Sequence, residues 1–356
     1  MHTDPRVDVI FPNLNKADYV TECLDSLLAQ SFQSWRCIVV DGNSDDGSWE
    51  IIQRYAREDS RFELYQPGRL GLYPSWNYGL EKVHSPYFTF LTSDDVWDPQ
   101  WLETAIRVLS GSPSSVAVSA RPVYVDVDTN VIGVPRLAKI ADEIAQRYVS
   151  SVDVDGTSAQ HRPGPLHAGL VYALGSVPIT MHALVMRKRL AGMQFMEDVG
   201  TIADREWYLR MGLRGPVTYL RSCNAYLRRY DEQATALTQR NRRELAASVR
   251  TILNRNAESV RTALQVPSDV FDRIDAVVRQ MFDFLYMRPS TSMLRTDSGQ
   301  ALSLLATTVK TYPGLLLREI LSVLFRGTKY STNQRVKAIE ELITHAGSMR
   351  SPKTTP

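Results

Sequence analysis

Short apolar runs alternate with amphipathic segments over the first 110 residues, and this alternation limits the fold more than any other feature of the chain. Four runs have the length and the β-branched or aromatic composition of strands: residues 7–11, 37–40, 61–65 and 87–91. Three segments between them carry apolar residues at helical spacing: residues 16–30, the stretch after Gly47-Ser48, and 74–83. Strands that alternate with helices need crossover connections, so we predict an α/β fold whose mostly parallel sheet has helices on both faces.

The run 87–91 is apolar or aromatic except for Thr89, so we expect it to be a central strand. Asp98-Pro99 predicts the start of a helix that runs to Leu109, because Asp caps helices and Pro suits their first turn. Beyond it, residues 111–180 mix short β-rich pieces with loops such as 161–165, and a helix is expected over 203–211.

The last part of the chain has a different character. Residues 240–285 and 299–346 are predicted to be helical, with a loop at 288–292 between them. We therefore expect a domain over 1–240, made of two halves (1–110 and 111–240), followed by a mainly helical region over 241–356.

Composition narrows the class of protein. The net charge is only +2, which predicts no nucleic-acid partner. The three cysteines are widely spaced and form no CxxC pair, which favours a reduced, cytoplasmic compartment. The N-terminus has no signal-peptide pattern, and no apolar run reaches the roughly 18 residues that span a bilayer.

Polar residues follow three of the predicted strands at their carboxyl ends, where open α/β sheets bind ligands. Asn13 and Asn15 follow the first strand, Asp41 ends the second, and Asp94-Asp95 follow the run 87–91. Adjacent carboxylates at the end of a buried strand repel each other, and a divalent ion such as Mg²⁺ or Mn²⁺ relieves that repulsion. The alternative for each of these groups is a solvated turn or a helix cap.

Four blocks in this order resemble family 2 glycosyltransferases, which have the GT-A fold. The blocks are Val9-Ile-Phe-Pro-Asn-Leu-Asn15, Val40-Asp-Gly-Asn-Ser-Asp-Asp-Gly-Ser48, Gly71-Leu-Tyr-Pro-Ser-Trp-Asn-Tyr-Gly79 and Phe90-Leu-Thr-Ser-Asp-Asp-Val-Trp-Asp-Pro99. The resemblance implies an inverting transfer from a nucleotide-diphospho-sugar, with Mn²⁺ or Mg²⁺ as cofactor. It implies Asp95 as a metal ligand, Asp94 as a second ligand or a ribose contact, and these further donor-binding residues: Pro12, Asn13, Asn15, Asp41 and Asn77.

A weaker resemblance continues to about residue 237. The segment Pro178-Ile-Thr-Met-His182 implies that His182 faces the acceptor, with a structural role as the alternative. The segment Ala203-Asp-Arg-Glu-Trp-Tyr-Leu-Arg210 implies Asp204 as the general base. Glu197, Asp198 and Glu206 remain alternatives for the base, and Asp204 has a structural alternative as a charge at a helix N-terminus.

The segment that begins Arg228-Arg-Tyr-Asp resembles the closing loop of the family, so Arg228 and Arg229 are implied to pair with the diphosphate. The family's His in this loop is not clearly present, and Tyr230 or Asp231 occupies its neighbourhood. A solvated basic turn is the alternative. Trp76 and Trp97 are candidates for stacking on a sugar or base, with core packing as the alternative.

The implied chemistry needs two separate acidic groups. In an inverting displacement the attacking hydroxyl loses a proton to a carboxylate, while the leaving diphosphate gains charge that a metal ion stabilises. We therefore expect sugar transfer to a glycan or lipid-linked acceptor in polysaccharide or cell-envelope biosynthesis. A sugar-phosphate nucleotidyltransferase would need a Gly-rich basic loop where Pro12-Asn-Leu-Asn15 stands, and a non-catalytic sugar-nucleotide or glycan-binding module is the other alternative.

The stretch 315–329 is apolar over most of its circumference and ends with Arg326 and Lys329. Such a segment can bind an anionic membrane surface, which would place the protein at the inner face of the membrane. The alternative is a helix buried against its neighbours or in a homo-oligomer.

Overall fold

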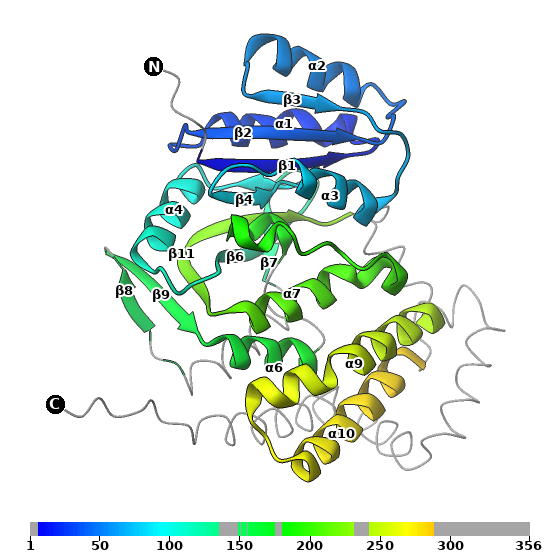
Figure 1. Ribbon diagram of the computed structural model, residues 1–356. Coiled ribbons are helices and arrows are strands. Elements are labelled where there is room, and N and C mark those ends of the chain that lie inside the picture. Colours follow the sequence, from blue (N-terminus) through cyan, green and yellow to red (C-terminus); the bar gives the residue numbers. More distant parts are fainter. Residues whose placement is uncertain are drawn as a thin grey trace.

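The chain folds into a single mixed sheet with helices on both faces, as a computed structural model shows (Figure 1). The structure describes residues 6–134, 149, 151–154, 156–174, 180–230 and 242–287. The first half contains β1 (Val7–Asn13), α1 (Ala17–Leu28), β2 (Trp35–Asp41), α2 (Ser48–Glu58), β3 (Phe62–Tyr65), α3 (Leu72–Glu81), β4 (Tyr87–Phe90), β5 (Val96–Trp97) and α4 (Trp101–Gly111).

The second half completes the sheet and adds helices. Its strands are β6 (Ala117–Val125), β7 (Val131–Gly133), β8 (Ser151–Val154), β9 (Thr157–Arg162), β10 (Leu184–Arg187) and β11 (Val217–Arg228). Its α-helices are α6 (Gly164–Leu174), α7 (Ala203–Arg214), α9 (Arg242–Leu264) and α10 (Ser268–Met287), and its 3-10 helices are η1 (Met181–Ala183), η2 (Lys188–Leu190) and η3 (Glu197–Ile202).

The strand order is β3-β2-β1-β4-β10-β6-β11-β9-β8, with β5 paired to β11 and β7 to β6. The first four strands are all parallel, β6 and β11 are parallel, and the other pairs are antiparallel. The predicted α/β fold is confirmed, and β4 is central as expected. The strand order reverses at β1, which pairs with β2 on one side and with β4 on the other. In such sheets the ligand-binding crevice lies at the carboxyl ends of the strands on either side of the reversal, so we expect it at the ends of β1, β2 and β4.

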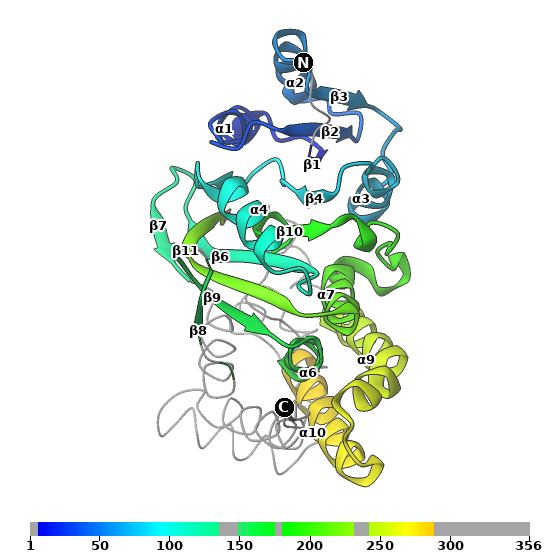
Figure 2. The same cartoon turned by 60° about the vertical axis from the view of Figure 1, so that its left-hand side comes forward.

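Alternate residues of the central strands pack into two hydrophobic cores, one on each face of the sheet. Val9 and Phe11 face the core built with α1 and α4, whereas Ile10 and Phe90 face the core built with α3, α6 and α7. Figure 2 shows α1 and α3 on opposite sides of β1. Buried residues of α9 and α10 belong to the same core as α6 and α7, so these two helices pack on the sheet domain.

Close packing fixes α3 against β1. A Cβ at Gly79 would lie 2.4 Å from Cγ2 of Ile10, so only glycine allows this approach. The contact matters for the site because α3 begins beyond the carboxyl end of β3.

Some predicted boundaries differ from the structure. The helix expected from Asp98-Pro99 begins at Trp101, since Asp98 accepts a hydrogen bond from the Gln100 backbone nitrogen and closes a turn first. Residues 161–165, predicted as a loop, end β9 and begin α6, and the helix predicted over 240–285 is two helices. The segments 288–292, 299–346 and 315–329 lie outside the described residues. Among the described helices, none is both long and apolar enough to cross a bilayer.

Candidate active site

Asp41 and Asn13 form a buried polar network where β2 and β1 end side by side. The two residues are register partners, and the Asn13 amide nitrogen donates to Asp41 Oδ1 at 2.8 Å. The Asp41 carboxylate also accepts hydrogen bonds from Ser44 and from the Gln66 side chain at 2.9 Å. Asn13 Oδ1 is buried without a hydrogen-bond partner among the described residues. A buried acceptor of this kind usually meets a partner from water or a ligand.

Asn15 forms hydrogen bonds that hold the loop between β2 and α2 in place. Its side chain exchanges two hydrogen bonds with Asp45, at 2.8 and 3.0 Å, and its own backbone has a positive φ of 51°. Asp46 in the same loop accepts a hydrogen bond from the Ala17 backbone nitrogen at the start of α1. Pro12 is buried within β1 opposite Val40. Pro12 and Asn15 therefore shape this edge of the sheet.

Asp95 lies inside the protein, directly after β4. Its carboxylate is 2% exposed and accepts hydrogen bonds from Thr92 Oγ1 and from the Arg228 backbone nitrogen at 2.9 Å. His182 Nδ1 lies 3.2 Å from Asp95 Oδ2. Burial, together with the charge of Asp94, raises the pKa of Asp95 well above its ordinary value, while Thr92 and Arg228 oppose the shift.

Asp94 is the more accessible member of the pair. Its Oδ2 accepts a hydrogen bond from the Tyr230 hydroxyl at 2.5 Å and lies 3.5 Å from the Lys16 ammonium. The Lys16 ammonium also donates to the Tyr230 hydroxyl. Asp94 therefore faces a cation of the protein itself.

His182 was predicted to face an acceptor, but the structure buries it beside Asp95 with 1% of its surface exposed. Burial lowers the pKa of His182 to about 4, against the opposing charge of Asp94, so its imidazole is neutral near pH 7. Trp97 is also buried and donates to the His182 carbonyl oxygen at 2.6 Å, which makes it a core residue here. Trp76 is likewise buried, within the aromatic cluster around Phe195.

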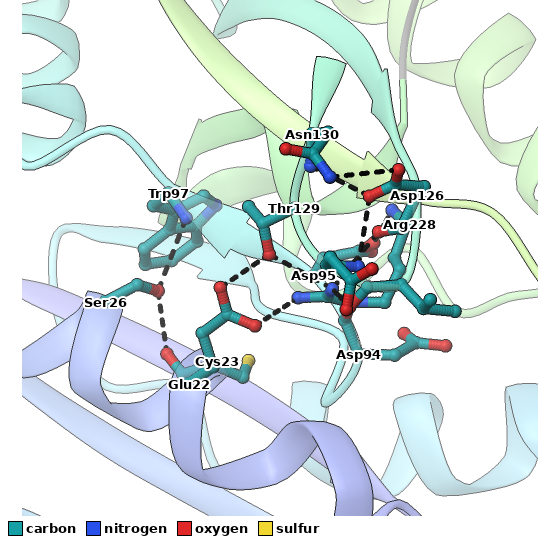
Figure 3. Close-up of polar contacts among 12 residues, drawn as sticks. Glu22, Cys23, Ser26, Asp94, Asp95, Trp97, Asp126, Thr129, Asn130 and Arg228 are labelled. Atoms are coloured by element: carbon teal, nitrogen blue, oxygen red, sulfur yellow. Dashed lines mark hydrogen bonds and ion pairs between the residues drawn. The ribbon is translucent and has the colours of Figure 1, made fainter. Parts of the chain in front are cut away.

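Arg228, predicted to bind the diphosphate, is 1% exposed and is bonded within the protein at all three guanidinium nitrogens (Figure 3). Nε donates to the Asp94 carbonyl oxygen at 2.9 Å, Nη1 to carbonyl and hydroxyl oxygens of residues 126–129, and Nη2 to Glu22 of α1 at 2.5 Å. This differs from the exposed cation that phosphate pairing requires. The structure instead makes Arg228 a residue that positions the 94–95 turn. Arg229 is partly exposed, with its guanidinium 4.9 Å from the ring centroid of Tyr124.

A second acidic site lies at the start of α7, where Asp204 is its carboxylate. The Tyr73 hydroxyl of α3 lies 3.2 Å from Asp204 Oδ1 and 2.9 Å from the Thr201 carbonyl oxygen, and the Arg205 backbone nitrogen donates to the same carboxylate at 2.8 Å. Burial raises the pKa of Asp204, whereas Arg205 and the Tyr73 hydrogen bond lower it. A carboxylate with a raised pKa has the character of a general base.

The three alternative bases differ from Asp204 in their contacts. Asp198 is exposed and paired with Arg255 of α9, which lowers the pKa of Asp198. Glu206 is fully buried and accepts two hydrogen bonds from Arg210, at 2.7 and 2.8 Å. Glu197 is exposed and accepts a hydrogen bond from Asn77 at 3.2 Å.

Asn77, predicted to contact the donor, is 7% exposed and forms hydrogen bonds with the backbone nitrogen and oxygen of Phe195 at 2.7 and 3.1 Å. It therefore ties α3 to the segment that leads into η3. This contact helps to place Tyr73 against Asp204.

Both acidic clusters lie at the same edge of the sheet. Asn13, Asp41 and Asp94 stand at or just after the carboxyl ends of β1, β2 and β4, which are parallel. The chain leaves the carboxyl end of β3 and begins α3 at Leu72, so Tyr73 and its partner Asp204 belong to this edge too. The edge thus combines a buried polar network around Asn13 and Asp41 with a separate, half-buried carboxylate, that of Asp204.

The acidic turn fits a divalent cation of the Mg²⁺ or Mn²⁺ type, with Asp94 as the better contact. Such ions take one or two protein carboxylates and complete their shell with phosphate oxygens and water. Within the described residues there is no cluster of three or more His, Cys, Asp or Glu that could hold a metal. Asp94 Oδ2 already faces the Lys16 ammonium, whereas both oxygens of Asp95 have partners inside the protein.

Several residues of this edge were not predicted from the sequence. Lys16, Gln66 and Glu22 carry no motif that marks them, and Tyr73 lies in the block 71–79 without being singled out there. Their contacts join residues that are 25 to 214 positions apart in the chain. Tyr230 had one signal, its place in the segment that begins at Arg228.

Comparison with known proteins shows which family and fold the chain resembles. Residues 8–165 match the model of the family described as "Glycosyl transferase family 2". The glycosyltransferase TuaG of Bacillus subtilis, named for teichuronic acid biosynthesis, is 36% identical over 106 residues, which are 30% of this chain and 42% of TuaG. The chain spans less than half of the length of the curated relatives it matches.

Two solved structures share the fold. Staphylococcus aureus TarS 1–349 in complex with UDP-GlcNAc superposes with a TM-score of 0.59 at 18% identity, over 96% of this chain and 91% of TarS 1–349. The mannosyltransferase PcManGT of Pyrobaculum calidifontis, in complex with GDP-Man and Mn²⁺, gives a TM-score of 0.52 at 16% identity, over 97% and 86% of the two chains. The predicted resemblance is confirmed: residues 8–165 match the model of family 2 glycosyltransferases, and the fold is that of GT-A glycosyltransferase structures.

Proposed function

We propose that the protein is an inverting, metal-assisted glycosyltransferase that moves a sugar from a nucleotide-diphospho-sugar to a hydroxyl group of a glycan or lipid-linked acceptor. The observation that carries the proposal is the pair of separate acidic clusters, Asp94-Asp95 and Asp204, at one edge of the sheet. One displacement at the anomeric carbon needs both a site for the leaving diphosphate and a base for the attacking hydroxyl.

The donor half of the mechanism rests on the ends of β1, β2 and β4. Asp41 and Asn13 are held rigidly together, and the unpartnered Asn13 Oδ1 can accept a hydrogen bond from the donor nucleoside. Asp94 would hold Mn²⁺ or Mg²⁺, with Asp95 and Arg228 behind it, and the bound ion would stabilise charge on the leaving diphosphate. The rigid support matters because a site held in place needs no reorganisation when the charge develops.

The acceptor half rests on Asp204. Its carboxylate takes the proton of the attacking hydroxyl, and the Tyr73 hydroxyl holds it in one orientation. Burial helps here, since a raised pKa makes the carboxylate a stronger base than an exposed one. A single displacement without a covalent intermediate inverts the anomeric carbon.

The relatives support a role in polysaccharide or cell-envelope biosynthesis. TuaG is named for teichuronic acid biosynthesis, and the TarS and PcManGT structures contain UDP-GlcNAc and GDP-Man. UDP- and GDP-sugars are therefore the donors to test first. The proposed location is the cytoplasm, with the segment 315–329 as the candidate contact with the inner face of the membrane.

The test is release of nucleoside diphosphate from a panel of UDP- and GDP-sugars, with Mn²⁺ or with excess chelator. We expect release from at least one donor with the metal and loss of release with the chelator. Full activity in chelator would contradict the metal role. Binding of a donor with no turnover, with or without candidate acceptors, would support a non-catalytic binding module instead.

A further inference from the structure

Lys16 lies at the donor edge but has no role in the mechanism above. It stands between the end of β1 and the start of α1, and its side chain crosses to the turn that follows β4. The ammonium lies 3.5 Å from Asp94 Oδ2 and 4.9 Å from the centroid of the Tyr230 ring. Its contact with the Tyr230 hydroxyl links the three side chains into one group.

The ion pair of Lys16 and Asp94 is partly shielded from solvent. The Lys16 and Asp94 side chains are 24% and 13% exposed, so their attraction is screened less than that of a surface ion pair. Tyr230 reinforces the pair because its hydroxyl accepts from the ammonium and donates to the carboxylate. Lys16 therefore balances the negative charge of Asp94 in this structure. A divalent cation bound to Asp94 would balance the same charge.

Lys16 and a divalent cation at Asp94 repel each other, so both cannot keep the same carboxylate oxygen. Lysine has a flexible four-carbon stem and is a common binder of phosphate as a point charge. The strongest anion brought to this edge by the proposed reaction is the diphosphate of the donor. A bound donor would therefore give the displaced ammonium a new anionic partner, its diphosphate.

We propose that Lys16 is a donor-site residue whose ammonium neutralises Asp94 in the donor-free protein and moves to the diphosphate when a divalent cation takes Asp94. The inference rests on the proposed function for its second half only. Its first half, competition between Lys16 and a cation, concerns this chain without any donor.

The first experiment titrates the full chain with Mn²⁺ alone and follows free Mn²⁺ by electron paramagnetic resonance. Removal of the competing ammonium in Lys16→Met should tighten Mn²⁺ binding by about 3- to 10-fold. Lys16→Arg keeps the charge and should bind Mn²⁺ like the natural protein. Lys82→Met is the matched control, because Lys82 also lies over tyrosine rings, those of Tyr65 and Tyr78, but has no contact with Asp94.

The second experiment titrates the same variants with UDP and with GDP at saturating Mn²⁺ by calorimetry. Lys16→Met should bind the nucleoside diphosphate about 10-fold more weakly, the loss of one charge-assisted contact, while Lys82→Met should not change. Tighter Mn²⁺ binding together with weaker UDP or GDP binding would indicate that Lys16 moves from Asp94 to the diphosphate. A purely structural defect would weaken both affinities.

The outcomes separate the two claims. Equal or weaker Mn²⁺ binding by Lys16→Met overturns the competition at Asp94. Unchanged UDP or GDP affinity in Lys16→Met overturns the move to the diphosphate. If the natural protein binds neither UDP nor GDP, the proposed donor class and the diphosphate half of this inference both fail, while the Mn²⁺ titration still decides the role of Lys16 at Asp94.

Discussion

At the scale of single residues, the two acidic clusters differ in what surrounds each carboxylate. Asp94 faces a lysine and a tyrosine hydroxyl, which suits a group that exchanges one cation for another. Asp204 is half-buried, with a tyrosine hydroxyl and a backbone nitrogen as partners, which suits a group that accepts a proton. The two proposed roles rest on the surroundings of each carboxylate, since both residues are aspartates.

Asp204→Asn should retain nucleotide binding and lose turnover by about 10²- to 10⁴-fold, because the amide cannot take the proton of the attacking hydroxyl. Asp198→Asn is the matched control, since Asp198 is exposed and paired with Arg255. Initial rates with the best donor measure both. Normal turnover in Asp204→Asn would move the base to Glu197, Asp198 or Glu206.

The pH dependence of turnover should follow Asp204, which acts only when ionised. Because burial raises its pKa, activity should fall as the pH drops through a value above the ordinary 3.8. Tyr73→Phe removes a hydrogen bond that lowers this pKa, so the acidic limb of the pH–rate profile should move to higher pH. Tyr78→Phe, at a ring that packs on Tyr65, should leave the limb in place. An acidic limb at the same pH in Tyr73→Phe as in the natural protein would contradict the proposed effect of the Tyr73 hydroxyl on the pKa of Asp204.

At the scale of elements, Arg228 joins parts of the chain that are distant in sequence. It ends β11 and binds the 94–95 turn, the turn between β6 and β7, and Glu22 of α1. A buried guanidinium with this many partners stabilises the arrangement of those elements around the acidic turn.

Arg228→Gln should destabilise the fold by about 2–4 kcal/mol, because it leaves buried carbonyl oxygens and the Glu22 carboxylate without their partner. Arg229→Gln should change stability by less than about 0.5 kcal/mol, since that side chain stacks on Tyr124 and is partly exposed. Urea unfolding of the two neighbouring variants makes the comparison. Native stability with lost UDP or GDP binding in Arg228→Gln would restore the predicted phosphate role.

The elements of the sheet were largely predictable, because the strands β1 to β4 are apolar runs and the helices between them keep a helical period. Asp41 and Asp94 were placed correctly at strand ends for the same reason. The partners of Arg228, His182 and Asn77 were not predictable, since each depends on backbone atoms or side chains that only the packed fold brings near. Local sequence predicts which element a residue belongs to, whereas burial decides which of its polar atoms remain for a ligand.

At the scale of the whole molecule, α9 and α10 pack on the sheet domain and share one of its two hydrophobic cores. The candidate site lies at one edge of this sheet, at the carboxyl ends of β1, β2 and β4. The buried residues of α9 and α10 share a core with α7, the helix that carries Asp204. Arg255 of α9 also reaches Asp198, so the C-terminal helices support the acceptor half of the edge.

Membrane contact is a prediction for the whole chain. Replacement of both Arg326 and Lys329 by glutamine should weaken flotation with anionic vesicles, because each cation near such a surface contributes about 1 kcal/mol. Neutral vesicles should show no difference between the two proteins. Equal flotation of natural and variant protein on anionic vesicles would favour the alternative, a segment buried by packing.

We propose that this edge binds a nucleoside diphosphate through a metal held by Asp94, while Asp204 serves the acceptor side. The most direct test is the shift in melting temperature with UDP or GDP and Mn²⁺, for the natural protein, Asp94→Asn and Asp204→Asn. We predict a Mn²⁺-dependent rise for the natural protein and Asp204→Asn, and none for Asp94→Asn. A rise that persists in chelator, or equal rises in all three proteins, would contradict the account.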